Sequence, residues 1–205
     1  YAQDKMEYKG LIANIGLRVD GYNSNVKMPA DIWDPFYPGT MGNAIGNPET
    51  TMPSTHITLS PRTGLSFPIG ENTAFRLQYG HFYDMPEFRQ LLSRGTWQGW
   101  VMYGNPDLGF EKTIQYEFGL QHSFNRKHRL DLVAFYNDRT RQTTAIRRHF
   151  DTGSVARSVS DPYASTYVNR GYGTTKGLEF SIERIRSSNL HYRFSYNLSR
   201  STTAY

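Results

Sequence analysis

Hydrophobic and polar residues alternate with a period of two along most of this chain. Every second residue is apolar in Leu11–Asp20, and the pattern returns in Thr113–Phe124 and Leu190–Ser199. Successive side chains of a strand point to opposite faces, so each segment is predicted to be a β-strand with one apolar face. No helix is predicted. Weaker alternation predicts further strands at Tyr1–Tyr8, His56–Phe67, Thr73–Tyr83, Leu130–Tyr136 and Gly177–Glu183.

Short and long connections alternate between the eight predicted strands. The short ones are tight turns such as Lys9–Gly10, whereas three loops are longer than about 12–15 residues, a length above which loops are uncommon in compact domains and usually functional. The long ones are Asn23–Thr55, Asp84–Glu111 and Asp138–Thr166. Short turns at one end and long loops at the other favour an all-β, antiparallel, up-and-down transmembrane β-barrel. A soluble β-sandwich shows the same alternation with its apolar face turned inward, and it stays an alternative.

Composition agrees with strands and narrows the chemistry. Among 205 residues there are 15 Tyr, 12 Phe and 3 Trp, an aromatic content that suits strands and argues against disorder. The absence of cysteine excludes disulfides, thiolate nucleophiles and cysteine-ligated metals. No apolar run reaches the roughly 18 residues of a membrane helix. A mean hydropathy of −0.63 does not argue against a barrel, because only alternate residues of its strands face lipid.

The polar face of the predicted strands carries charges of both signs, which a barrel would direct into its lumen. We interpret them as solvated or salt-bridged side chains. Six scattered histidines lack metal-ligand spacing, and no Gly-x-Ser-x-Gly elbow is present, so we predict no catalytic residue, metal site or cofactor and no enzyme. The pI is about 9.4, but the basic residues form no stripe along the chain, so no nucleic-acid partner is expected either. The predicted lumen-facing residues are Arg18, Arg62, Arg76, Glu117, Glu179 and Arg193.

The long loops supply the candidate ligand-binding residues. Trp97, Trp100 and Tyr103 would stack on rings of a solute, or the loop folds back and buries them. The loop Asp138–Thr166 is basic, and its arginines would bind an anionic ligand or lipopolysaccharide phosphate, or simply be solvated. The arginines chosen as candidates are Arg141, Arg147 and Arg148.

Several stretches, in order along the chain, resemble TonB-dependent outer-membrane receptors. The most specific is Gly104-Asn105-Pro106-Asp107-Leu108, followed by Glu111 and Tyr116-Glu117. The resemblance covers nearly all of residues 1–205 and is nearest to receptors with a carboxypeptidase-regulatory-like N-terminal domain. The other similar stretches are Gln3–Lys5, Tyr8–Leu11, Gly16–Asp20, Leu59–Ser66, Ala134–Asp138, Tyr167–Asn169 and Lys176–Glu179.

This resemblance implies the bacterial outer membrane and a 22-stranded barrel, of which residues 1–205 would be a partial wall without the plug domain. The receptor would bind a scarce solute (siderophore, cobalamin, oligosaccharide or peptide) at its external loops. It would import the solute with energy from the TonB–ExbB–ExbD complex acting through the plug, amid outer-membrane lipid and lipopolysaccharide. The polar segment Ser199–Ala204 and the short first strand favour a fragment over a complete eight-stranded barrel. The competing function is a soluble or surface carbohydrate-binding β-sandwich that uses Trp97 and Trp100.

Overall fold

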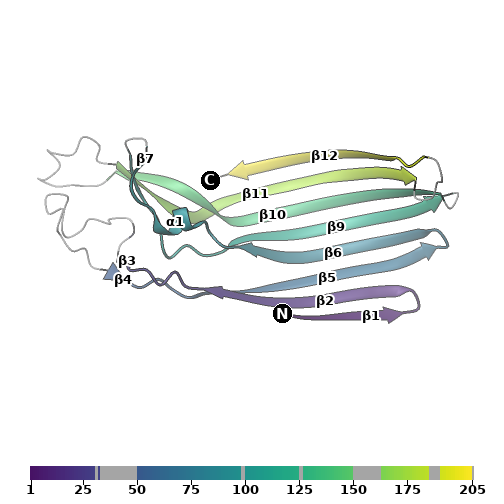
Figure 1. The fold of residues 1–205 in the computed structure, drawn as a ribbon, viewed down its shortest axis with the longest axis horizontal. Helices are drawn as coiled ribbons and strands as arrows, with labels where there is room; N and C mark the ends of the chain where they lie inside the picture. Colours follow the sequence, from purple (N-terminus) through teal and green to yellow (C-terminus); the bar gives the residue numbers. More distant parts are fainter. Residues whose placement is uncertain are drawn as a thin grey trace, which may run out of the picture.

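A single curved sheet dominates the structure (Figure 1). The computed structural model describes residues 1–30, 32, 50–97, 100–124, 127–149, 163–184 and 190–204, without the side chains of 94–97, 100, 101, 148, 149, 163 and 164. Eight long strands, which we call the wall, are β1 (Ala2–Tyr8), β2 (Leu11–Tyr22), β5 (His56–Gly70), β6 (Thr73–Asp84), β9 (Glu111–Phe124), β10 (His128–His149), β11 (Tyr163–Arg184) and β12 (Arg193–Ala204).

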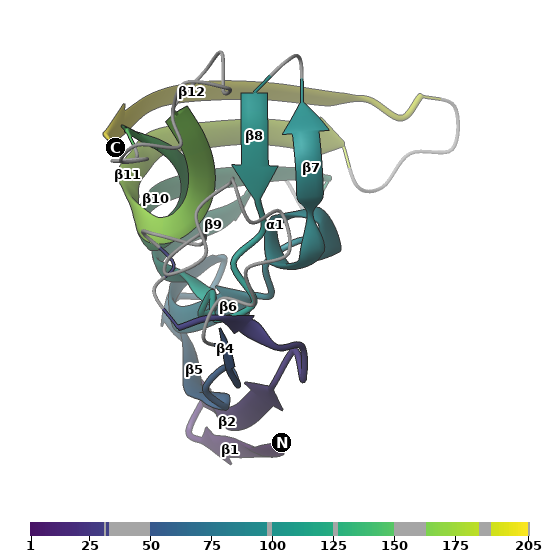
Figure 2. The same ribbon diagram turned by 90° about the vertical axis from the view of Figure 1, so that its left-hand side faces the viewer.

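The wall strands pair antiparallel with their neighbours in chain order, which confirms the predicted up-and-down arrangement. Seen end-on in Figure 2, they follow one another along an arc from β1 to β12. The first turn consists of Lys9 and Gly10, both with positive φ (48° and 87°). Two residues in this conformation match the right-handed twist of the flanking strands, and glycine adopts it without steric cost.

The structure corrects the sequence prediction in the long connections. Strand β10 continues through His149 and β11 begins at Tyr163, so the ends of the predicted loop Asp138–Thr166 are strand. The predicted loop Asp84–Glu111 contains a five-residue helix, although no helix was expected. The shorter elements are β3 (Met28–Pro29), β4 (Thr50–Thr51), α1 (Phe88–Leu92), β7 (Arg94–Trp97) and β8 (Trp100–Tyr103).

Strand register gives the wall an apolar face and a polar face. In one row of the apolar face Leu77 stands opposite Phe118, Phe118 opposite Ala134, and Leu178 opposite Ala134 and Leu198. These side chains are uncovered: Leu198 is 59% exposed and Ile57 71%. The β-sandwich alternative is therefore wrong, because a second sheet would bury this face.

Tertiary packing is concentrated where the long connections leave the wall. A core of Leu91, Leu108 and Tyr167, with Tyr22 and Met102 packed against it, lies at this rim. Within the described part of the chain, no helix has the length and apolarity needed to cross a membrane.

Candidate functional site

The segment 104–110 connects β8 to β9 and folds back onto the ends of the wall strands. Asn105 is buried and donates a side-chain hydrogen bond to the backbone oxygen of Tyr167 (3.0 Å). Its Oδ1 accepts one from the Asp107 backbone (3.0 Å), and Asp107 Oδ1 accepts one from the Ser54 backbone (2.7 Å). Three parts of the chain that are distant in sequence are thereby joined.

Glycine at 104 lets α1 approach this segment. A Cβ at Gly104 would lie 2.6 Å from the backbone of Leu91, closer than real contacts allow. The Gly104 and Asn105 backbone amides donate to the carbonyls of Ser93 (2.6 Å) and Gln90 (2.8 Å). The helix is thus held against the rim by backbone hydrogen bonds.

Aromatic rings pack against one another at the rim ends of strands β2 and β5. The Tyr22 ring lies edge-on to Phe110, with centroids 4.9 Å apart, and 5.4 Å from the ring of His56. The Tyr22 hydroxyl donates to the carbonyl of Leu108. Burial, and next the negative charge of Asp107, raise the pKa of Tyr22 to about 12. His56 Nε2 lies 3.3 Å from Asp107 Oδ1.

Asn169 of β11 fixes the same segment to an irregularity in β10. Its Oδ1 accepts from the Gly109 backbone (2.7 Å), and its Nδ2 donates to the carbonyls of Gly109 (3.1 Å) and Arg141 (3.0 Å). Arg141 has a φ of +59° and sits where the β10–β11 register shifts. We call the following residues the rim cluster: Tyr22, His56, Asn105, Asp107, Leu108, Phe110, Tyr167 and Asn169.

Below the rim, a chain of ion pairs crosses the polar face of β6, β10, β11 and β12. Asp131 lies 3.3 Å from Arg76 and 3.1 Å from Arg129. Arg129 also lies 3.2 Å from Glu183, which is 3.8 Å from Arg193. Arg76, Arg129, Asp131 and Arg193 line a hollow of about 520 Å³. Glu179, which accepts a hydrogen bond from Asn197 (2.8 Å), lines the same hollow.

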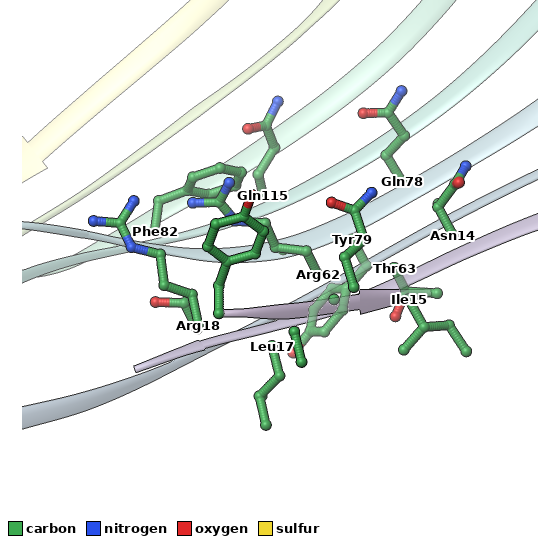
Figure 3. A pocket seen from close by; sticks show the side chains of 17 residues that line it. Asn14, Ile15, Leu17, Arg18, Arg62, Thr63, Gln78, Tyr79, Phe82 and Gln115 are labelled. Atoms are coloured by element: carbon green, nitrogen blue, oxygen red, sulfur yellow. The ribbon is translucent and has the colours of Figure 1, made fainter. Parts of the chain in front are cut away.

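A second hollow, of about 740 Å³, lies on the polar face of β2, β5, β6 and β9. Figure 3 shows Asn14, Gln78 and Gln115 on the opposite side of the strands from Leu17. Arg62 lies over the ring of Phe82, 4.5 Å from its centroid, and Arg18 pairs with Asp20 at 2.7 Å. No carboxylate lines this hollow among the described residues, and its polar groups are amides, hydroxyls and the guanidinium groups of Arg18 and Arg62.

The six residues predicted to face a lumen all lie on the polar face. Arg18 and Arg62 line the larger hollow, and Arg76, Glu179 and Arg193 line the smaller one. Glu117 stands between the two hollows, opposite Gln78. No group of three His, Cys, Asp or Glu that could hold a metal ion is found within the described residues.

The candidate ligand-binding residues lie at the rim, but not in open loops. Arg141, Arg147 and Arg148 belong to β10, a correction to their predicted loop position, and the first two are exposed. Trp97 ends β7 and Trp100 begins β8; their side chains, and that of Arg148, lie outside the described residues. Tyr103 ends β8 and is half-buried. Sequence reasoning missed Asn169, His56 and Asp107, although the stretches Gly104–Leu108 and Tyr167–Asn169 carried the family resemblance.

A sheet with one uncovered apolar face, one charged face, tight turns at one end and folded connections at the other is a segment of an outer-membrane β-barrel wall. The model of the family "TonB dependent receptor-like, beta-barrel" matches residues 1–205, and the chain belongs to this family. Its members are outer-membrane proteins of bacteria.

Solved structures share the fold at low sequence identity. The siderophore receptor PirA of Pseudomonas aeruginosa matches with a TM-score of 0.63 and 18% identity, over 98% of this chain and 33% of that one. The FrpB iron transporter of Neisseria meningitidis matches with a TM-score of 0.61 and 14% identity, over 97% of this chain and 24% of that one. A variant of the ferric enterobactin receptor PfeA of P. aeruginosa, in complex with enterobactin, matches with a TM-score of 0.62 and 17% identity. The match covers 98% of this chain and 26% of that one. The chain spans a quarter to a third of these proteins. A search of curated proteins gave no match.

Proposed function

We propose that residues 1–205 form part of the wall of a receptor that binds a scarce solute outside the cell and imports it through the barrel. The observation that carries this proposal is the charged polar face, whose two hollows are lined by arginine, amide and carboxylate groups. A wall that served only as an anchor would need no such set of groups. Energy would come from the TonB–ExbB–ExbD complex acting on a plug domain outside this chain, without chemical change of the solute.

The solute would first meet the rim. The aromatic candidates there are Trp97, Trp100 and Tyr103, and the cationic candidates are Arg141, Arg147 and Arg148 on the part of β10 nearest the rim. Exposed arginines bind carboxylate, catecholate or phosphate oxygens through two parallel hydrogen bonds. Two of the structural relatives are named as siderophore or ferric enterobactin receptors, which supports a ferric siderophore as the first solute to test. Cobalamin, an oligosaccharide or a peptide are the other candidates.

The test uses the full-length gene. A deletion strain is complemented with the wild-type receptor, and uptake of radioactive iron is measured with a panel of siderophores, alongside growth on the other solutes. The deletion should abolish uptake of one solute, and removal of TonB from the complemented strain should abolish it as well. Uptake that persists without TonB would overturn the proposal.

A charge-matched pair of variants tests the rim arginines. Arg141→Ala combined with Arg147→Ala should raise the solute concentration for half-maximal binding by roughly tenfold or more, since a charged hydrogen bond contributes about 1.5–3 kcal/mol. Lys5→Ala combined with Lys9→Ala removes the same charge from the middle of β1 and from the first tight turn, both far from the rim, and should leave binding unchanged. Equal effects of the two double variants would exclude a role for the rim arginines.

A further inference from the structure

The larger hollow on the polar face contains a cation without a counter-ion (Figure 3). The guanidinium of Arg62 lies over the ring of Phe82, 4.5 Å from its centroid. Within the described part of the chain, neither an ion pair nor a hydrogen bond joins Arg62 to another residue. Arg18, the other cation of the hollow, is already paired with Asp20 at 2.7 Å. The hollow therefore presents one uncompensated positive charge.

Glycine at position 80 makes room for the ring that supports this cation. Gly80 stands directly opposite Arg62 in the register of β5 and β6. A Cβ at Gly80 would lie 2.9 Å from Cε2 of Phe82, closer than real contacts allow, so the ring would have to move. Packing on a ring uses up none of the five N–H donors of a guanidinium. Arg62 is thus held against the wall with its donors available to a ligand.

Side-chain amides surround this cation on the same face. Gln115 stands opposite Gly80, while Asn14 and Gln78 both stand opposite Gly64, one row nearer the tight turns. All three amides line the hollow, and none of them is hydrogen-bonded to another described residue. Each amide has two N–H donors that can reach an anionic oxygen. No carboxylate among the described residues lines the hollow to compete for them.

The smaller hollow has the opposite character. Its Arg129 lies 3.1 Å from Asp131 and 3.2 Å from Glu183, so its charge is already compensated. Arg129 is also close to the tight turn between β9 and β10, whereas Gly80 and Arg62 lie in the half of the wall nearer the rim. A solute that comes from the rim would therefore reach the uncompensated cation first.

We propose that Arg62 and the amides around it bind a carboxylate group of the imported solute below the rim. The planar fork of a guanidinium matches a carboxylate through two parallel hydrogen bonds. One uncompensated cation balances a single negative charge, which favours a carboxylate over a doubly charged phosphate. The hollow, about 740 Å³, has the size of a small-molecule site. The inference names the substrate class of the proposed receptor and rests on the proposed function.

The first test needs only the purified full-length wild-type receptor. Benzoate is the probe and benzamide its uncharged counterpart. Phenylglyoxal modifies accessible guanidinium groups, and mass spectrometry of peptides reports on Arg62 alone. Benzoate should protect Arg62 from modification at a concentration roughly tenfold or more below that of benzamide, because hydrogen bonds between charged groups are the stronger ones.

Three results of this test would overturn the inference. Equal protection by benzoate and benzamide would remove the role of the charge. Protection by inorganic phosphate as strong as by benzoate would remove the preference for carboxylates. Failure of Arg62 to react when no probe is added would show that another part of the receptor, such as a carboxylate of the plug domain, already occupies the site.

Variants of the full-length receptor give a second measurement, the affinity for benzoate by calorimetry. Arg62→Gln should weaken binding roughly tenfold or more, and Arg62→Lys should recover only part of the loss, since an ammonium lacks the planar fork. Gly80→Ala should weaken binding by displacing the Phe82 ring. The control is Lys9→Gln, because Lys9 also lies over a ring, that of Tyr8 at 5.2 Å, but in the first tight turn. Equal losses in Arg62→Gln and Lys9→Gln would contradict the inference.

Uptake by the complemented deletion strain separates the two proposals. The imported solute should carry a carboxylate, and Arg62→Gln should raise the solute concentration for half-maximal uptake. TonB-dependent uptake that Arg62→Gln leaves unchanged would reject this inference alone. Protection of Arg62 by benzoate, in a receptor that imports no solute, would reject the proposed function alone.

Discussion

Leu108, in the connection between β8 and β9, is 1% exposed, whereas Leu198, in wall strand β12, is 59% exposed. The same contrast holds more widely. Of the seven buried hydrophobic residues among those described, only Ala13 lies in a stretch of wall far from the rim; the others are Met28, Leu91, Leu108, Phe110, Tyr167 and Val168. The rim packs against itself, as a soluble domain does, while the wall leaves its apolar side chains to the surrounding lipid. The apolar side chains of the rim are therefore buried by protein, and those of the wall are covered by lipid.

The largest expected effect comes from making the same truncation in both regions. Leu108→Ala should destabilise the full receptor by about 2–5 kcal/mol, because it leaves a cavity in a packed core. Leu198→Ala should cost less than about 1 kcal/mol, since lipid chains fill the space. Denaturant unfolding in lipid vesicles measures both. Equal losses would show that the wall is packed as tightly as the rim.

The next test inverts the comparison by placing a charge in the wall. Leu132 is on the apolar face and 41% exposed, and Leu132→Arg should cost about 2–4 kcal/mol, as cations near the bilayer midplane do. Val133 is its neighbour on the polar face, opposite Glu179, so Val133→Arg should be tolerated. The fraction of each variant that folds into lipid vesicles measures the difference between Leu132→Arg and Val133→Arg. If both variants fold equally well, the assignment of the two faces is wrong.

Two asparagines sharpen the contrast in hydrogen bonding. Asn169 joins Gly109 and Arg141 through three bonds, so Asn169→Ala should cost about 1–3 kcal/mol by leaving backbone groups unpaired. Asn197 is exposed and bonds only Glu179 among the contacts described, so Asn197→Ala should change stability by less than about 0.5 kcal/mol. The difference in denaturation midpoint measures the effect. A larger loss at Asn197 would contradict the view that the rim is the hydrogen-bonded centre.

The smallest effect concerns the Tyr22 hydroxyl. Its pKa is raised from 10.0 to about 12, so the stability that depends on the neutral hydroxyl is complete below pH 10 and is lost as the pH rises toward 12. Ultraviolet titration of the wild type minus Tyr22→Phe isolates this one tyrosinate. The wall tyrosines contribute equally to both samples and cancel. A difference spectrum with a midpoint near pH 10 would show that Tyr22 is not enclosed by the rim cluster.

The wall was predictable from sequence, but the rim was not. Alternation in Leu11–Asp20 or Thr113–Phe124 reveals both a strand and its two faces, because the period of two is a property of the backbone. It also placed all six lumen candidates on the polar face. The extension of β10 to His149 has no such signal, because its residues there do not alternate in polarity and the strand is stabilised by pairing with β11. Arg141, Arg147 and Arg148 were therefore expected in a loop.

By itself, the sequence determined the order of the strands, the tight turns and the apolar face of each strand, whereas only the structure showed that no second sheet covers that face. Each of these follows from local spacing and from the membrane's demand for an apolar exterior. Only the tertiary structure decided which distant residues meet. Tyr22 and Leu108 are 86 positions apart, and the bonds of Asn169 to Gly109 join strand β11 to the connection between β8 and β9. Such contacts depend on strand register and loop closure, which leave no periodic mark in the sequence.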